Sequence, residues 1–136
     1  MKKRVVIYGD SNTWGYDAVT GGRFNEDIRW PMVAAKLLGS EYRILEEGLC
    51  GRTTCLDDPF NEGLSGLTYL LPCLQTHSPL DMLVIMLGTN DCKQRFSLTA
   101  ANIALGMRRL VKKALEAEVW RDKPNILVIA PGPILK

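Results

Sequence analysis

The chain reads Val5-Val6-Ile7-Tyr8-Gly9-Asp10-Ser11-Asn12-Thr13-Trp14-Gly15 near its beginning, so that a short apolar run passes directly into a turn of glycine and polar residues. The run 5–8 lacks a clean alternation of apolar and polar residues, which is typical of a strand buried on both faces. Three further runs predict strands: residues 42–45, 83–87 and 126–130. Because the run 42–45 is shorter and more polar than the others, we expect it to be an outer strand.

Helical patterns lie between the predicted strands. Residues 30–38 carry apolar side chains at helical spacing, with Pro31 suited to the first turn and Gly39 to the end of the helix. A second apolar stripe runs through residues 103–114, and a third helix is expected from about Leu71 onward, because Pro72 would break an interior turn.

Alternating strands and helices imply right-handed βαβ crossovers and a parallel sheet covered on both faces. The predicted fold is therefore an α/β fold, a three-layer α/β/α sandwich with a parallel, flavodoxin-like sheet. We expect residues 1–136 to form a single domain.

The length and the net charge of the chain indicate how many domains it has and which partners it is suited to bind. A chain of 136 residues suits one domain, and its net charge of +2, from 17 basic and 15 acidic residues, gives no reason to expect a nucleic acid or an anionic membrane as partner. The basic start is followed by only a short apolar run, whereas a membrane helix needs about 20 apolar residues and a signal peptide a longer apolar stretch than this. We interpret the chain as a cytosolic protein.

The cysteines and the single histidine do not form a recognisable metal-binding pattern. The four cysteines are Cys50, Cys55, Cys73 and Cys92, and the histidine is His77. Their spacings fit no common zinc motif, and the thiols of a cytosolic protein are expected to be reduced and partly buried. We expect neither a metal nor an organic cofactor.

Polar turns follow each of the first three predicted strands, and in an open parallel sheet such turns meet at one edge. They are residues 9–15, 46–54 and 88–91. Ser11 offers a hydroxyl that could attack a carbonyl, while the Gly51 N–H and the Asn90 amide are donors of the kind that stabilise an oxyanion. Each feature alone is also explained by an ordinary turn or helix cap. Their order after three successive strands favours an acyl-transfer site.

The sequence resembles the SGNH hydrolase family, the GDSL-type esterases, and within it the arylesterase and acyltransferase branch. The resemblance covers essentially the whole chain and lies in four segments: residues 9–15, 47–54, 57–59 and 86–91. It implies that Ser11 is the nucleophile, that Gly51 and Asn90 complete an oxyanion hole with the Ser11 N–H, and that Asp10 and Thr13 support the turn. It also implies a small-molecule ester as substrate and no cofactor. Trp14 would line the acyl pocket, although core packing explains a tryptophan at this position equally well.

One part of the family pattern is absent. The family takes its base from an Asp-x-x-His motif near the C-terminus, and this sequence contains none. His77 precedes the strand 83–87, which spans roughly 16 Å, so we expect it near the opposite edge of the sheet, beyond reach of the Ser11 proton. We expect it instead to make a structural hydrogen bond at a helix end. We therefore expect the chain to lack a C-terminal strand and helix, and to be inactive or poorly active alone.

The leading hypothesis is a serine esterase or acyltransferase that works through an acyl-serine intermediate. A flavodoxin-like domain that binds a flavin or nucleotide is an alternative, in which Ser11 and Thr13 would contact a phosphate, although the Asp10 carboxylate opposes that reading. A catalytically incomplete structural fragment is a third alternative.

The long connection of residues 15–29 suits a pocket wall or a contact between subunits, so self-association is plausible.

Overall fold

The computed structural model describes residues 1–133, in which four parallel strands form one sheet with the order β2-β1-β3-β4. The strands are β1 (Lys3–Gly9), β2 (Tyr42–Gly48), β3 (Met82–Met86) and β4 (Ile126–Val128). The predicted parallel α/β sheet is confirmed, and within residues 1–133 β2 is an outer strand as expected. The predicted end of the domain, at residue 136, lies outside the described residues.

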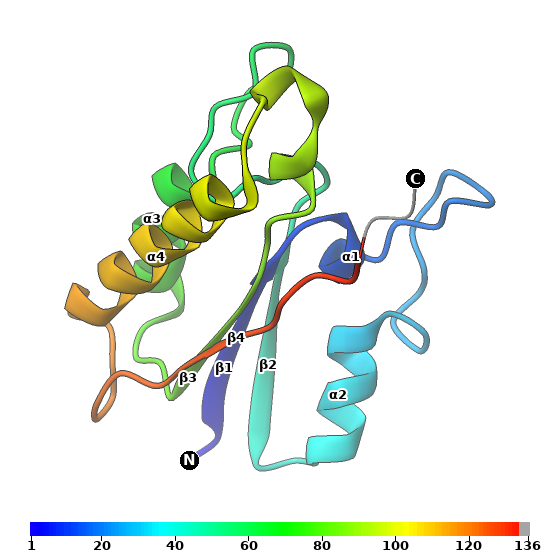
Figure 1. Ribbon diagram of the computed structural model, residues 1–136. Helices are drawn as coiled ribbons and strands as arrows, with labels where there is room; N and C mark the ends of the chain where they lie inside the picture. Colours follow the sequence, from blue (N-terminus) through cyan, green and yellow to red (C-terminus); the bar gives the residue numbers. More distant parts are fainter. Residues whose placement is uncertain (134–136) are drawn as a thin grey trace.

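Helices cover both faces of the sheet (Figure 1). The helix α3 (Gly66–His77) and the helix α4 (Ala100–Glu116) lie on one face, and α2 (Trp30–Leu38) lies on the other. Shorter turns follow two of the strands: α1 (Ser11–Trp14), η1 (Asn90–Cys92) and η2 (Gln94–Phe96). The three-layer arrangement predicted from the sequence is therefore present. None of the helices in the described part of the chain has the length and apolar character that a membrane span requires.

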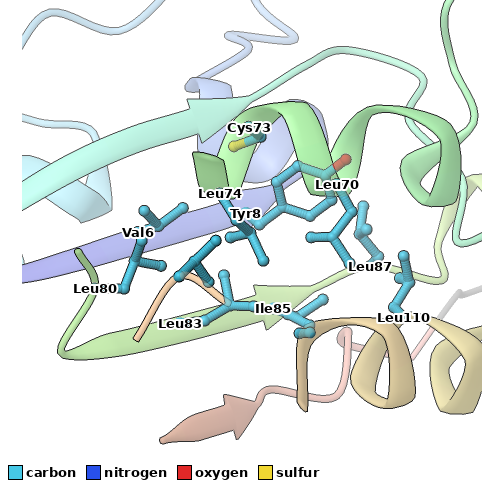
Figure 2. Close-up of a cluster of buried hydrophobic side chains, with 12 residues drawn as sticks. Val6, Tyr8, Leu70, Cys73, Leu74, Leu80, Leu83, Ile85, Leu87 and Leu110 are labelled. Carbon is cyan, nitrogen blue, oxygen red and sulfur yellow. The ribbon is translucent and has the colours of Figure 1, made fainter. Parts of the chain in front are cut away.

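Alternate residues of β1 supply the two halves of the core, because successive side chains of a strand point to opposite faces. Val6 and Tyr8 belong to the larger cluster, which α3 and α4 cover with residues such as Leu70 and Leu110 (Figure 2). Val5 and Ile7 belong to the smaller cluster on the α2 face. This double burial explains why the run 5–8 lacks alternation.

The register of the sheet aligns the strand ends that carry the polar turns. Gly9, the last residue of β1, pairs with Gly48 at the end of β2 and with Met86 at the end of β3. The turns that follow β1, β2 and β3 therefore leave the sheet at the same edge, as the sequence predicts.

The predicted start of α3 at about Leu71 is wrong, because the helix begins at Gly66 and contains Pro72 in its interior. An interior proline costs about 3 kcal/mol. However, Leu70, Cys73 and Leu74 on either side of it are fully buried. Burying large apolar side chains contributes about 1.5–3 kcal/mol each, so tertiary packing outweighs the local penalty.

The second strand also differs from its prediction, because β2 is seven residues long and is not a short strand. It continues through Glu46 and Glu47, which the sequence pattern places in the following turn. Glu46 pairs with Ile7 in the sheet, and its carboxylate accepts two hydrogen bonds from Arg29, at 2.6 and 2.8 Å. The Glu46 carboxylate is tolerated in this strand because the Arg29 guanidinium balances its negative charge.

Candidate active site

Ser11 lies at the first position of α1, immediately beyond the end of β1. Asp10 caps this turn: its carboxylate accepts a hydrogen bond from the Asn12 N–H at 3.0 Å, and its backbone carbonyl accepts from the N–H groups of Thr13 and Trp14. The chain therefore reverses direction within a few residues. This reversal leaves Ser11, which is half-buried, at the carboxyl edge of the sheet.

Gly48 lets this turn pack directly on the end of β2. A Cβ atom at residue 48 would lie 2.3 Å from the Trp14 backbone nitrogen, a distance that no side chain tolerates. Any other residue at this position would push α1 away from the sheet and move Ser11. The glycine at the end of the second strand thus fixes the position of the first turn.

The second turn is joined to the first through the backbone carbonyl of Gly9. That oxygen accepts hydrogen bonds from the Leu49 N–H at 3.2 Å and from Arg52 Nη1 at 3.1 Å. Arg52 Nη1 also donates to the Glu47 carbonyl at 2.6 Å, and the guanidinium lies over the Tyr8 ring at 4.3 Å from its centroid. Arg52 is only 3% exposed, so it holds the two turns together from inside the protein.

The third turn is joined to the second by two adjacent side chains. The Asn90 amide donates to the Arg52 carbonyl at 3.1 Å. The Asp91 carboxylate, which is buried, accepts from the Thr54 N–H at 2.9 Å and from the Thr54 hydroxyl at 2.5 Å. Neither Arg52 nor Asp91 stands out by residue type in the sequence, although both lie in the segments that carry the family resemblance.

The three donors predicted for an oxyanion hole remain open, wholly or in part, within residues 1–133. Within residues 1–133, the N–H groups of Ser11 and Gly51 have no acceptor, and the Asn90 amide uses one of its two hydrogens on Arg52. Uncommitted N–H groups at one edge are what an oxyanion requires. The structure thus brings the predicted donors onto turns that hydrogen bonds tie together. Their catalytic roles stay predictions.

The supporting residues differ in their surroundings. Asp10 is buried, and burial raises the pKa of its carboxyl group, against the lowering effect of the Asn12 N–H. Thr13 is fully buried, and its hydroxyl has no hydrogen-bond partner among the described residues. Trp14 belongs to neither apolar cluster; its ring lies 4.7 Å from the Arg23 guanidinium, and its carbonyl accepts from Arg23 Nε at 2.7 Å. Trp14 thus faces the long connection, and its role in an acyl pocket stays a prediction.

His77 makes the expected structural hydrogen bond, but its ring lies nearer the carboxyl edge than predicted. Nε2 is 2.7 Å from Glu47 Oε1, and Glu47 pairs with Tyr8 in the carboxyl-terminal half of the sheet. Helical side chains point back toward the N-terminus of their helix, and α3 runs against the strands, so the ring reaches toward that edge. With Glu47 as its partner, His77 is not hydrogen-bonded to Ser11.

The cysteines are all free thiols in the described chain. Cys73 is buried and Cys55 is partly buried, whereas Cys50 and Cys92 are exposed, so the expected partial burial holds for only two of them. Partial desolvation and the nearby Asp10 carboxylate raise the pKa of the Cys50 thiol, although the residue as a whole is exposed.

Comparisons with known proteins identify the family and the fold. Residues 7–136 match the model of the GDSL-like lipase/acylhydrolase family. The structure is similar to that of the native M. smegmatis aryl esterase, with 45% identity, a TM-score of 0.89, and coverage of 96% of this chain and 65% of that chain. It is also similar to a carbohydrate acetylesterase family member from Sinorhizobium meliloti, with 42% identity, a TM-score of 0.93, and coverage of 98% and 65%. The chain therefore spans about 65% of the length of these solved structures. No curated protein gives a significant match.

Proposed function

Because the chain belongs to the GDSL-like lipase/acylhydrolase family, we propose that it carries the nucleophile and the oxyanion hole of a carboxylic ester hydrolase, with Ser11 as the nucleophile. The observation that carries the proposal is the set of open donors on three turns that hydrogen bonds hold together. Solved relatives are named as an aryl esterase and a carbohydrate acetylesterase, so we propose aryl or acetyl esters as the substrate class.

The reaction proceeds in two steps. The Ser11 hydroxyl oxygen attacks the ester carbonyl carbon, and its proton passes to a base. The carbonyl oxygen becomes an oxyanion, which the N–H groups of Ser11 and Gly51 and the Asn90 amide stabilise. The carbon–oxygen bond to the alcohol then breaks, and the base returns the proton to the leaving alcohol. Water or a second alcohol attacks the acyl-serine by the same route in reverse, which gives hydrolysis or acyl transfer.

The base is not among the residues that the structure describes. His77 is the only histidine in the sequence, and Glu47 holds its ring. The activity is therefore proposed for a whole protein of the length of its relatives, with a histidine and an aspartate outside this chain. The cytosolic location and the self-association stay predictions.

The turn itself argues against the flavodoxin-like alternative. A phosphate bound at the start of α1 would need the N–H groups of that turn as donors. The Asp10 carboxylate already accepts the Asn12 N–H and would place a negative charge against the phosphate.

Replacement of Ser11 tests the proposal directly in the whole protein. We expect Ser11→Ala to abolish turnover of p-nitrophenyl acetate and covalent labelling by a fluorophosphonate. Ser40→Ala, at an exposed serine before β2, is the matched control and should leave both unchanged. Retained turnover and labelling in Ser11→Ala would reject the assignment.

A further inference from the structure

A second group of reactive side chains lies on β2 and α3 and includes none of the proposed oxyanion-hole residues. One ligand atom from each of Glu47, Cys73 and His77 lies within 4.8 Å of the other two. We propose that these three side chains form a binding site for a single transition-metal ion of the Zn²⁺ type. The proposal does not depend on the ester chemistry.

The backbone presents the three side chains on rigid elements. Cys73 and His77 are four residues apart on α3, so their side chains project from the same face of the helix. Glu47 comes from β2, where it pairs with Tyr8. The sequence pattern alone could not find this group, because a search for zinc motifs among cysteines and histidines leaves out Glu47.

The ligand atoms lie within 4.8 Å of one another, so a bound ion would bring them to its own ligand spacing. Zinc lies about 2.3 Å from sulfur and about 2.0 Å from nitrogen or oxygen, so tetrahedral ligand atoms are roughly 3.3–3.6 Å apart. His77 Nε2 and Glu47 Oε1 are 2.7 Å apart and share a hydrogen bond. A bound ion would replace that bond, and the two partly exposed side chains would move apart by less than about 1 Å.

The donor set selects the class of ion. A thiolate, an imidazole and a carboxylate suit Zn²⁺ or Co²⁺, whereas Mg²⁺ and Ca²⁺ prefer oxygen ligands alone. The thiolate and the carboxylate together balance the charge of a divalent ion. Burial and the nearby Glu47 carboxylate raise the pKa of the Cys73 thiol to about 12, so the ion has to displace the thiol proton as it binds.

Neighbouring groups orient the ligands and leave room for a fourth one. The Tyr69 hydroxyl lies 3.3 Å from Glu47 Oε2, and Arg4 Nε donates to the His77 carbonyl at 2.9 Å. Cys73 lies beside Leu70 and Leu74, which hold this part of α3 in the core (Figure 2). A pocket of about 660 Å³ touches Glu47 and Tyr69, so water or a small ligand can reach the ion from that side.

Cobalt provides a probe that reports on the sulfur itself. We expect Co²⁺ to bind one ion per chain and to give the near-ultraviolet charge-transfer band of a thiolate ligand. Cys73→Ser should abolish the band and weaken Zn²⁺ binding, measured by calorimetry, by at least about 100-fold, since changes even to outer-shell groups cost 10–100-fold. Cys92→Ser, at an exposed thiol, is the matched control and should retain both.

A second variant keeps the test valid if Cys73→Ser does not fold. His77 is the last residue of α3 and is partly exposed, so His77→Ala leaves the apolar core intact. Zn²⁺ should raise the melting temperature of the parent protein and have little effect on this variant. The proposal is overturned if the parent shows no cobalt–thiolate band, or if His77→Ala gains as much stability from Zn²⁺ as the parent. In that case the three side chains form a hydrogen-bonded group only.

Discussion

The side-chain amide of Asn90 donates a 3.1 Å hydrogen bond to the backbone carbonyl of Arg52, the residue that follows Gly51. This bond fixes the plane of the amide relative to the second turn. One amide hydrogen points to Arg52, and the other has no acceptor among residues 1–133. A single side chain therefore positions both a donor and the loop that carries another donor.

Replacing Asn90 with alanine removes both functions. We expect Asn90→Ala in the whole protein to lower kcat for p-nitrophenyl acetate by about 10²–10³-fold with a smaller change in KM, because an oxyanion donor acts mainly in the transition state. Asn125→Ala is the matched control, since the Asn125 amide also donates to a backbone carbonyl, that of Asp81, at the other end of β3. Equal kinetic losses in the two variants would show that Asn90 has no special role.

Gly51 has a backbone conformation that other residues rarely adopt. Its φ angle is 86°, and a Cβ atom there would lie 2.9 Å from Leu64 Cδ1. Gly63 has a similar φ of 79° with nothing within 4 Å of such an atom. We expect both Gly51→Ala and Gly63→Ala to lose about 1–2 kcal/mol of stability in urea unfolding, from the left-handed backbone.

Only the first of these two changes should impair the ester reaction. In Gly51→Ala the strained φ and the contact with Leu64 Cδ1 act on the residue whose N–H is the proposed donor, whereas Gly63→Ala leaves that residue unchanged. We expect kcat to fall in Gly51→Ala and to stay within about twofold of the parent in Gly63→Ala. A Gly51→Ala protein with normal kcat would remove Gly51 from the proposed oxyanion hole.

The sheet and the candidate turns could be predicted from the sequence because their signals are local. The run 5–8 ends at Gly9 and Asp10, and a buried strand that stops at a glycine and a capping residue predicts a turn at the sheet edge. The contact of Glu47 with His77 could not be predicted in this way, because it joins residues 30 positions apart. At Pro72 the local signal is misleading. A proline predicts the end of a helix, but α3 continues through it because the side chains around it are buried in the folded protein.

The ion pair of Asp58 and Arg95 makes stability depend on pH. The Phe60 N–H, at 2.8 Å, and the Arg95 guanidinium, at 2.5 Å, lower the pKa of the Asp58 carboxyl group below its ordinary value of 3.8. A lowered pKa means that the stabilising contribution is present above pH 3.8 and is lost as the pH falls through the folded-state value.

Urea unfolding at several pH values checks this dependence. At pH 7 we expect Asp58→Asn to unfold at a lower urea concentration than the parent, and the two midpoints should converge below about pH 3.8. Asp57→Asn changes the neighbouring exposed carboxylate and should leave the midpoint nearly unchanged at pH 7. A constant difference between Asp58→Asn and the parent across the whole pH range would contradict the assignment.

Arg52 joins all of the candidate turns, which makes it the most informative position for stability and activity together. Its Nη1 donates to the carbonyls of Gly9 and Glu47, and its guanidinium lies beside the stacked rings of Tyr8 and Tyr69, at 4.3 and 5.3 Å from their centroids. Lysine keeps the charge but has neither the planar group nor the fork of donors. A buried ammonium group on the shorter lysine side chain would sit differently against the two carbonyls and would lose the planar contact with the Tyr8 ring.

We therefore expect Arg52→Lys to lower the free energy of unfolding by about 2–3 kcal/mol. Its kcat for p-nitrophenyl acetate should also fall at temperatures where the protein is still folded, because the Gly9 carbonyl and the backbone that anchors Asn90 lose their common support. Arg43→Lys, at an exposed arginine on β2, is the matched control and should change neither quantity. If Arg52→Lys matched the parent in both measurements, the turns would be held by their backbone hydrogen bonds alone, and the guanidinium would be only a space-filling group.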